Sequence, residues 1–137
     1  MALTITTSNE NVLVGEKIDV SLQVKNVSGE TLSIVESYYG DEVWLVDGRE
    51  ARLPVPCKRE VMPRRTVQPG QAVRYVRHIY WNSNNQLYYT GNEKVSLPLQ
   101  SPGDHTFKVR VTLGRLIPGK HGVIESNEIS ISLKKGT

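Results

Sequence analysis

The sequence predicts an all-β fold in which antiparallel strands form a sandwich or a barrel, and three observations lead to it. First, several runs alternate apolar and polar residues, the pattern of a strand with one buried face; KIDVSLQVK at residues 17–25 is the clearest. Second, turn signals recur about every ten residues. Third, no window carries the apolar stripe of an amphipathic helix. A chain of 137 residues can bury the core of about seven to nine such strands.

The first half of the chain supplies strands separated by polar turns. After the strand at 17–25, the Asn-, Ser- and Gly-containing turn at 26–30 leads to a second strand at 31–36. Residues 42–46, EVWLV, form a third strand that ends at an Asp-Gly pair typical of hairpins. The segment 53–63 carries three prolines, which lack a backbone donor, so we expect an edge strand or an extended loop there.

The strand after Pro69-Gly70, QAVRYVRHIYW, has an ambiguous phase. Val73 and Tyr75 share one face, whereas Val76 lies on the other. A bulge or burial on both faces would explain this pattern.

The last third of the chain repeats the turn-then-strand pattern. Residues 82–86 form a polar turn, and residues 87–99 hold one or two short strands. Pro102-Gly103 precedes a strand predicted to bury Phe107, Val109, Val111 and Leu113 and to expose Thr106, Lys108, Arg110 and Thr112. The sequence also predicts a closing strand at 126–133, in which the side chains of Ile129, Ile131 and Leu133 point inward.

Four of these segments, taken in chain order, resemble bacterial immunoglobulin-like domains, including the intracellular proteinase inhibitor family: KIDVSLQVKNVSGETLSI, VQPGQAVRY, SPGDHTFKVRV and SNEISISL. The resemblance implies one immunoglobulin-like antiparallel β-sandwich domain of about 7–9 strands over residues 1–137. Such domains often carry Tyr where this chain has His105, whose imidazole can make a comparable hydrogen bond. Because fold does not determine function, the resemblance leaves two roles: a noncatalytic binding or spacer module of a larger bacterial protein, or a proteinase inhibitor.

Catalytic and metal-binding motifs are absent from the sequence. Cys57 is the single cysteine, which excludes a disulfide within the chain, and the three histidines lack the spacing of metal ligands on one element. There is no nucleophile motif and no Gly-rich phosphate loop, so we expect no enzyme activity, no metal and no cofactor.

The sequence shows no signal-peptide pattern and no apolar run that would insert into a membrane. A glycosylation sequon begins at Asn26.

The first candidate binding surface is basic. Residues 49–77 hold eight Lys and Arg against two Glu, a charge of +6, which leaves −3 for the rest of a chain of net charge +3. We expect six cations to share one edge and bind an acidic protein or an anionic polymer: Arg49, Arg52, Lys58, Arg59, Arg64 and Arg65. Arg74 and Arg77 join them only if their face is exposed. Nucleic acid is disfavoured because no aromatic residue is interleaved with the cations before Tyr75. The alternative is a solvated edge that only maintains solubility.

Two further candidates are aromatic residues and a loop. Tyr80, Trp81, Tyr88 and Tyr89 flank a polar turn and form an aromatic surface for sugar or protein, unless they complete the core. The Pro-rich segment 53–63 is the inhibitory loop if the protein is a proteinase inhibitor, and otherwise a proline-blunted sheet edge.

Overall fold

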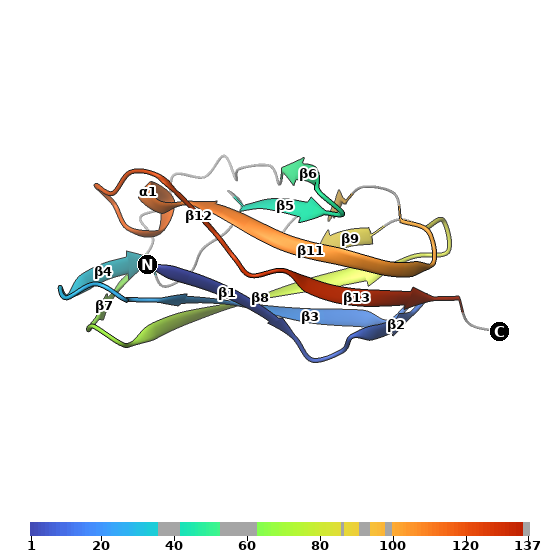
Figure 1. Cartoon of the computed structure of the whole chain (residues 1–137), viewed down its shortest axis with the longest axis horizontal. Helices are drawn as coiled ribbons and strands as arrows, with labels where there is room; N and C mark the ends of the chain where they lie inside the picture. Colours follow the sequence, from blue (N-terminus) through green and yellow to red (C-terminus); the bar gives the residue numbers. More distant parts are fainter. Residues whose placement is uncertain (36–41, 53–62, 86, 91–93, 98–99, 136–137) are drawn as a thin grey trace.

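The structure is a computed structural model that describes residues 1–35, 42–52, 63–85, 87–90, 94–97 and 100–135. It confirms an all-β fold, with two large sheets forming the layers of a sandwich (Figure 1). One sheet has the strand order β1 (Ala2–Thr7), β3 (Lys17–Lys25), β8 (Ala72–Trp81), β9 (Leu87–Thr90) and β10 (Lys94–Ser96). The other has the order β2 (Asn11–Leu13), β13 (Ile129–Lys134), β11 (Gly103–Thr112), β5 (Glu42–Val46) and β6 (Arg49–Arg52).

Three short strands and one helical turn complete the described chain. β4 (Leu32–Val35) and β7 (Arg64–Val67) form a separate two-stranded sheet, and β12 (Val123–Glu125) pairs with β11. α1 (Leu113–Leu116) follows β11, and no helix in the described ranges is long and apolar enough to cross a membrane. The strands pair antiparallel, as expected, except that β2 and β13 are parallel.

The core lies between the two large sheets and contains the apolar residues that the alternation predicted. Trp44 and Phe107 of one sheet and Trp81 of the other are fully buried. The inward phase predicted for 17–25 is confirmed, because β3 buries Ile18, Val20, Leu22 and Val24. Val109 and Val111 are buried as predicted, but Leu113 is only half-buried because α1 begins there and breaks the period of two.

The alternation of buried and exposed residues along β8 is more regular than the sequence indicated. Its pairing with β3 runs without interruption from Lys25 opposite Ala72 to Lys17 opposite Tyr80. The expected bulge or two-sided burial is therefore wrong. Val76 is an exposed apolar residue, 45% accessible, on an otherwise regular strand.

The hairpin between β5 and β6 confirms the Asp-Gly turn prediction. Asp47 and Gly48 have φ values of 51° and 80°, the left-handed conformations that such turns require. The Asp47 carboxylate accepts the Thr106 backbone N–H at 2.9 Å and lies 2.6 Å from His105 Nδ1. His105 Nε2 donates to the Ser101 carbonyl oxygen at 2.6 Å, so the imidazole makes the backbone hydrogen bond expected of it.

The sequon asparagine has a structural role in this fold. Asn26 is fully buried, and its Nδ2 donates to the carbonyl oxygens of Glu30 at 2.8 Å and Val67 at 3.0 Å. Its Oδ1 accepts the Ser28 N–H at 3.0 Å. The side chain thus joins the end of β3 to β7, and a glycan on Nδ2 would replace one of its two hydrogens and so remove one of these donor bonds.

Val109 is buried and Val76 is exposed, so the same substitution, valine to aspartate, should have opposite outcomes at the two positions. Val109→Asp places an unpaired charge in the fully buried core, and we expect it to prevent cooperative folding. Val76→Asp on the exposed face should shift the unfolding free energy by less than about 1 kcal/mol. Thermal unfolding followed by circular dichroism measures both, and similar melting of the two variants would contradict the assigned phases.

The Asp47 contacts predict a pH-dependent contribution to stability. Burial tends to raise the pKa of Asp47, but the hydrogen bonds from His105 and Thr106 and the nearby positive charges lower it below its ordinary value. A lowered folded-state pKa stabilises the fold above the unfolded pKa of about 3.9, and this stabilisation is lost as pH falls through the folded pKa.

Asp47→Asn keeps a residue that tolerates positive φ but removes the charge. We expect this variant to lose about 1 kcal/mol of unfolding free energy near pH 6, a loss that shrinks below about pH 4. Urea unfolding of both proteins across this pH range makes the comparison. A difference that stays constant with pH would contradict the role of the carboxylate.

Candidate functional site

A buried ion pair joins the two large sheets. Arg77 of β8 and Glu42 of β5 are only 4% and 1% exposed. The Arg77 Nε donates to Glu42 Oε1 at 2.6 Å, and its Nη2 pairs with the same oxygen. The Trp44 indole N–H donates to Glu42 Oε2 at 3.2 Å, and Arg77 Nη1 donates to the Val76 carbonyl oxygen at 3.2 Å. Arg77 therefore belongs to the core and adds nothing to an exposed basic surface.

The electrostatics of this pair follow from its burial. Burial raises the pKa of the Glu42 carboxyl above its ordinary value, while Arg77 and the Trp44 hydrogen bond oppose the rise. Sequence reasoning missed the pair, although a signal existed: Arg77 is in phase with the buried Val73, Tyr75, Ile79 and Trp81.

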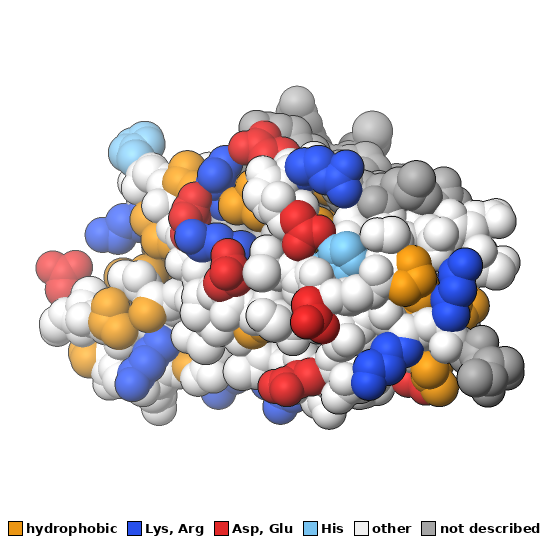
Figure 2. All heavy atoms as spheres, turned by 45° about the vertical axis from the view of Figure 1, so that its right-hand side comes forward, with side chains coloured by type: hydrophobic (Ala, Val, Ile, Leu, Met, Phe, Trp, Pro, Cys, Tyr) orange, Lys and Arg blue, Asp and Glu red, His pale blue; other side chains and the backbone are white. Residues whose placement is uncertain are grey.

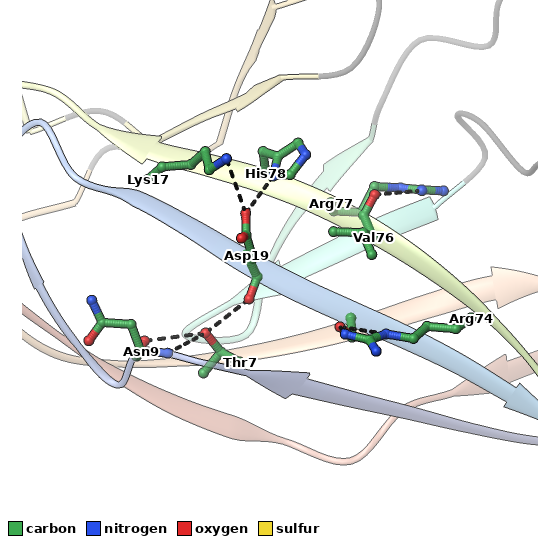
Figure 3. Close-up of polar contacts among 9 residues, drawn as sticks. Thr7, Asn9, Lys17, Asp19, Arg74, Val76, Arg77 and His78 are labelled. Atoms are coloured by element: carbon green, nitrogen blue, oxygen red, sulfur yellow. Dashed lines mark hydrogen bonds and ion pairs between the residues drawn. The ribbon is translucent and has the colours of Figure 1, made fainter.

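An ordered group of side chains covers the outward face of β3 and β8 (Figure 3). We call it the outer polar strip: Lys17, Asp19 and Ser21 on β3, and Arg74, Val76 and His78 on β8. The register places Asp19 opposite His78 and Ser21 opposite Val76.

Polar contacts hold the strip together from strand to strand. Asp19 Oδ1 lies 2.5 Å from His78 Nδ1 and 3.8 Å from Lys17 Nζ. Arg74 donates from Nε at 3.1 Å and from Nη2 at 2.7 Å to the Ser21 hydroxyl. The strip therefore presents an organised, mainly polar surface at which Val76 is the apolar member.

The cations at one end of the sandwich form no ion pair with an acidic residue of the described chain. We call Lys25, Arg64, Arg65 and Arg74 the basic end: Lys25 ends β3, the next two lie on β7, and Arg74 lies near the start of β8. Figure 1 shows β7 at the end of the sandwich where β8 begins. None of the four forms an ion pair with any described residue, and all four are exposed.

Two cations on the outward face of the six-stranded sheet, Lys108 and Arg110, are paired instead. Lys108 lies 2.8 Å from Glu125, and Arg110 contacts Glu125 at 3.0 Å and Glu50 at 2.9 Å. The hydrogen bonds from Lys108 and Arg110 lower the pKa of Glu125, and those to Glu50 and Glu125 raise the pKa of Arg110. Acidic and basic side chains are likewise interleaved on the face shown in Figure 2.

The structure does not assemble the single basic edge predicted from the sequence. Arg49 and Arg52 lie on β6 in the six-stranded sheet, whereas Arg64 and Arg65 lie on β7 in the two-stranded sheet. Residues that are close in the sequence do not share an edge here, because β6 and β7 belong to different sheets. Lys58 and Arg59 lie outside the described residues, as does the segment 53–62 that the inhibitor hypothesis needs.

The predicted aromatic surface is divided between two faces. Trp81 is fully buried and completes the core, so its assignment to a surface is wrong. Tyr80 is half-buried on the outward face, where the register sets Tyr88 opposite it. Tyr89 lies opposite the buried Ile79. Successive strand residues point to opposite faces, so neighbours in sequence separate.

Within the described ranges, no group of three or more His, Cys, Asp and Glu side chains gathers to hold a metal ion. His78 and His105, which lie on different sheets, contact the carboxylates of Asp19 and Asp47. Fold and site together define an all-β sandwich protein with an ordered, partly basic outer sheet face.

No family model matches this chain, and no curated protein matches it either. Among solved structures, it is similar to a beta-glucosidase from Listeria innocua at 15% identity and a TM-score of 0.42, covering 98% of this chain and 16% of the enzyme chain. It is also similar to Spo0M, a sporulation control protein from Bacillus subtilis, at 16% identity and a TM-score of 0.43, covering 97% of this chain and 49% of that one. The chain thus spans a small part of the enzyme and about half of Spo0M. Such low identities and TM-scores assign neither a family nor an activity.

The buried ion pair predicts a non-additive pair of substitutions. Arg77→Met leaves the Glu42 carboxyl buried without its partner, and we expect a loss of about 3–5 kcal/mol of unfolding free energy. The double variant Arg77→Met, Glu42→Leu removes both charges and should be clearly more stable than Arg77→Met alone. Denaturant unfolding of wild type, both single variants and the double variant tests this. Additive losses would show that the two side chains are not coupled.

Proposed function

We propose that this protein is a noncatalytic binding module, an immunoglobulin-like sandwich that engages an acidic partner through its basic end and the adjoining outer polar strip. The observation that carries this proposal is the separation of charge. Lys25, Arg64, Arg65 and Arg74 form no ion pair with any described residue, whereas Lys108 and Arg110 on the outward face of the six-stranded sheet are paired with Glu50 and Glu125. The likeness of its strand and turn segments to bacterial immunoglobulin-like domains supports a module of a larger bacterial protein.

The contacts of the two described strand histidines support binding over catalysis. A catalytic base needs a nucleophile or a reacting proton within hydrogen-bond reach. Both ring nitrogens of His105 are instead taken up by the Asp47 carboxylate and the Ser101 carbonyl oxygen, and His78 Nδ1 contacts the Asp19 carboxylate. These contacts connect neighbouring strands and turns, which is a structural use of the imidazole.

Unpaired surface cations attract an acidic partner over long range. Complementary charge raises association rates, and salt screens it over a Debye length of about 8 Å at physiological ionic strength. An acidic protein surface and an anionic polymer both supply the required charge. Binding through the basic end should therefore be strong at low salt and weak at high salt.

A charge-reversal pair tests this function against a matched control. Lys25→Glu combined with Arg74→Glu should weaken binding to poly-L-glutamate and heparin at low salt by about tenfold. The control, Lys134→Glu combined with Lys135→Glu, changes net charge equally at exposed positions near the C-terminus, at the other end of the sandwich from β7 (Figure 1). Binding is measured by column retention and by titration at two salt concentrations. Equal losses in both double variants would show that net charge alone acts and would overturn the proposal.

A further inference from the structure

We propose that the partner contributes an extended acidic-apolar peptide segment that lies along β8, with a carboxylate on Arg74 and an apolar side chain on Val76. This inference rests on the binding function proposed above and names the chemistry of the partner at the same surface. Three features of the outer polar strip support it: a pre-oriented guanidinium, an exposed valine beside it, and a stretch of strand whose one described strand neighbour is β3.

The Arg74 guanidinium is already oriented for a carboxylate. Its Nε and Nη2 both donate to the Ser21 hydroxyl, which holds the planar group against the sheet. Nη1 and the second hydrogen of Nη2 remain as donors, and no carboxylate of the described chain occupies them. A side chain that is fixed before binding loses less conformational entropy when the partner arrives. Arg74 is therefore better suited to recognition than a mobile surface cation.

Val76 supplies the apolar part of the contact. It lies two residues after Arg74 on the same outward face and directly opposite Ser21. A single exposed valine is common on protein surfaces, but this one lies beside an oriented cation within a long regular strand. A partner side chain that covers Val76 would also exclude water from the Arg74 contact and so strengthen it.

The geometry of β8 favours an extended partner. β9 pairs with β8 only from His78 to Trp81, so in the described structure the stretch that carries Arg74 and Val76 has β3 as its single strand neighbour. Alternate residues of an extended chain are spaced at about 6.6 Å, the same spacing that separates outward side chains on a strand. An acidic residue followed two positions later by an apolar residue matches Arg74 and Val76 in one register. Lys25, opposite Ala72, adds a second cation near the acidic end.

Synthetic peptides test this inference directly. The first probe has the repeat Glu-Ser-Leu-Ser, the second replaces each Leu with Ser, and the third replaces each Glu with Gln. We expect the wild-type protein to bind the first peptide about fivefold more tightly than the second, and not to bind the third. Fluorescence anisotropy at low salt gives the dissociation constants.

Two variants and a control assign the preference to individual side chains. Val76→Thr keeps the branched shape and should remove the preference for the leucine peptide while leaving the binding of the serine peptide unchanged. Arg74→Gln should weaken both acidic peptides about fivefold. Lys134→Gln removes one exposed charge at the other end of the sandwich and should have little effect. Circular dichroism of each variant confirms that the fold is retained.

The outcomes separate this inference from the binding function. If Val76→Thr keeps the preference while charge reversal of Lys25 and Arg74 abolishes binding, the peptide inference is overturned and the binding function stands. If the wild type binds heparin but none of the peptides, the partner is an anionic polymer and the inference is overturned as well. If charge reversal also has no effect, both proposals are overturned.

Discussion

The rest of this structure depends on one constraint: each strand of the two large sheets has one face that must be buried against the other sheet. Trp44 and Phe107 from one sheet meet Trp81 from the other with no solvent exposure, and the alternating aliphatic residues fill the space around them. Removing this apolar surface from water is the main driving force for folding. It also decides which residues are left outside, because on strands such as β3 the residues between two core positions point away from the core.

The buried Arg77–Glu42 pair is an exception within this apolar core. Removing two charges from water is costly, and the Coulomb attraction compensates only when further hydrogen bonds are made. Trp44 supplies one such bond to Glu42, and the Val76 carbonyl oxygen accepts one from Arg77. The pair is directional, unlike the surrounding aliphatic contacts, so it favours one alignment of β8 on β5. It also connects the backbone of the outer polar strip to the core.

The proposed binding function depends on the cations that form no ion pair with any described residue. On the six-stranded sheet, Lys108 and Arg110 are neutralised by glutamates on neighbouring strands. At the basic end, Lys25 and Arg74 face solvent, and Arg74 is held only by a neutral hydroxyl. Because the Ser21 hydroxyl is neutral, it fixes the position of the Arg74 guanidinium and leaves its positive charge available for an ion pair. A partner that brings a carboxylate therefore adds an ion pair and does not have to compete with one.

The sequence by itself determined the all-β class, the inward faces of β3 and β11 and the Asp47-Gly48 turn, because period-two burial and turn chemistry are local properties of the chain. It missed β1 and β2, because the two buried positions of β1, Leu3 and Ile5, and the single one of β2, Val12, are too few to establish a period. The sequence alone could not group the site residues, because strand pairing separated Arg49 from Arg65 and buried Trp81 and Arg77. Only the tertiary structure decided which cations meet carboxylates and which stay unpaired, since that depends on contacts between strands far apart in the chain.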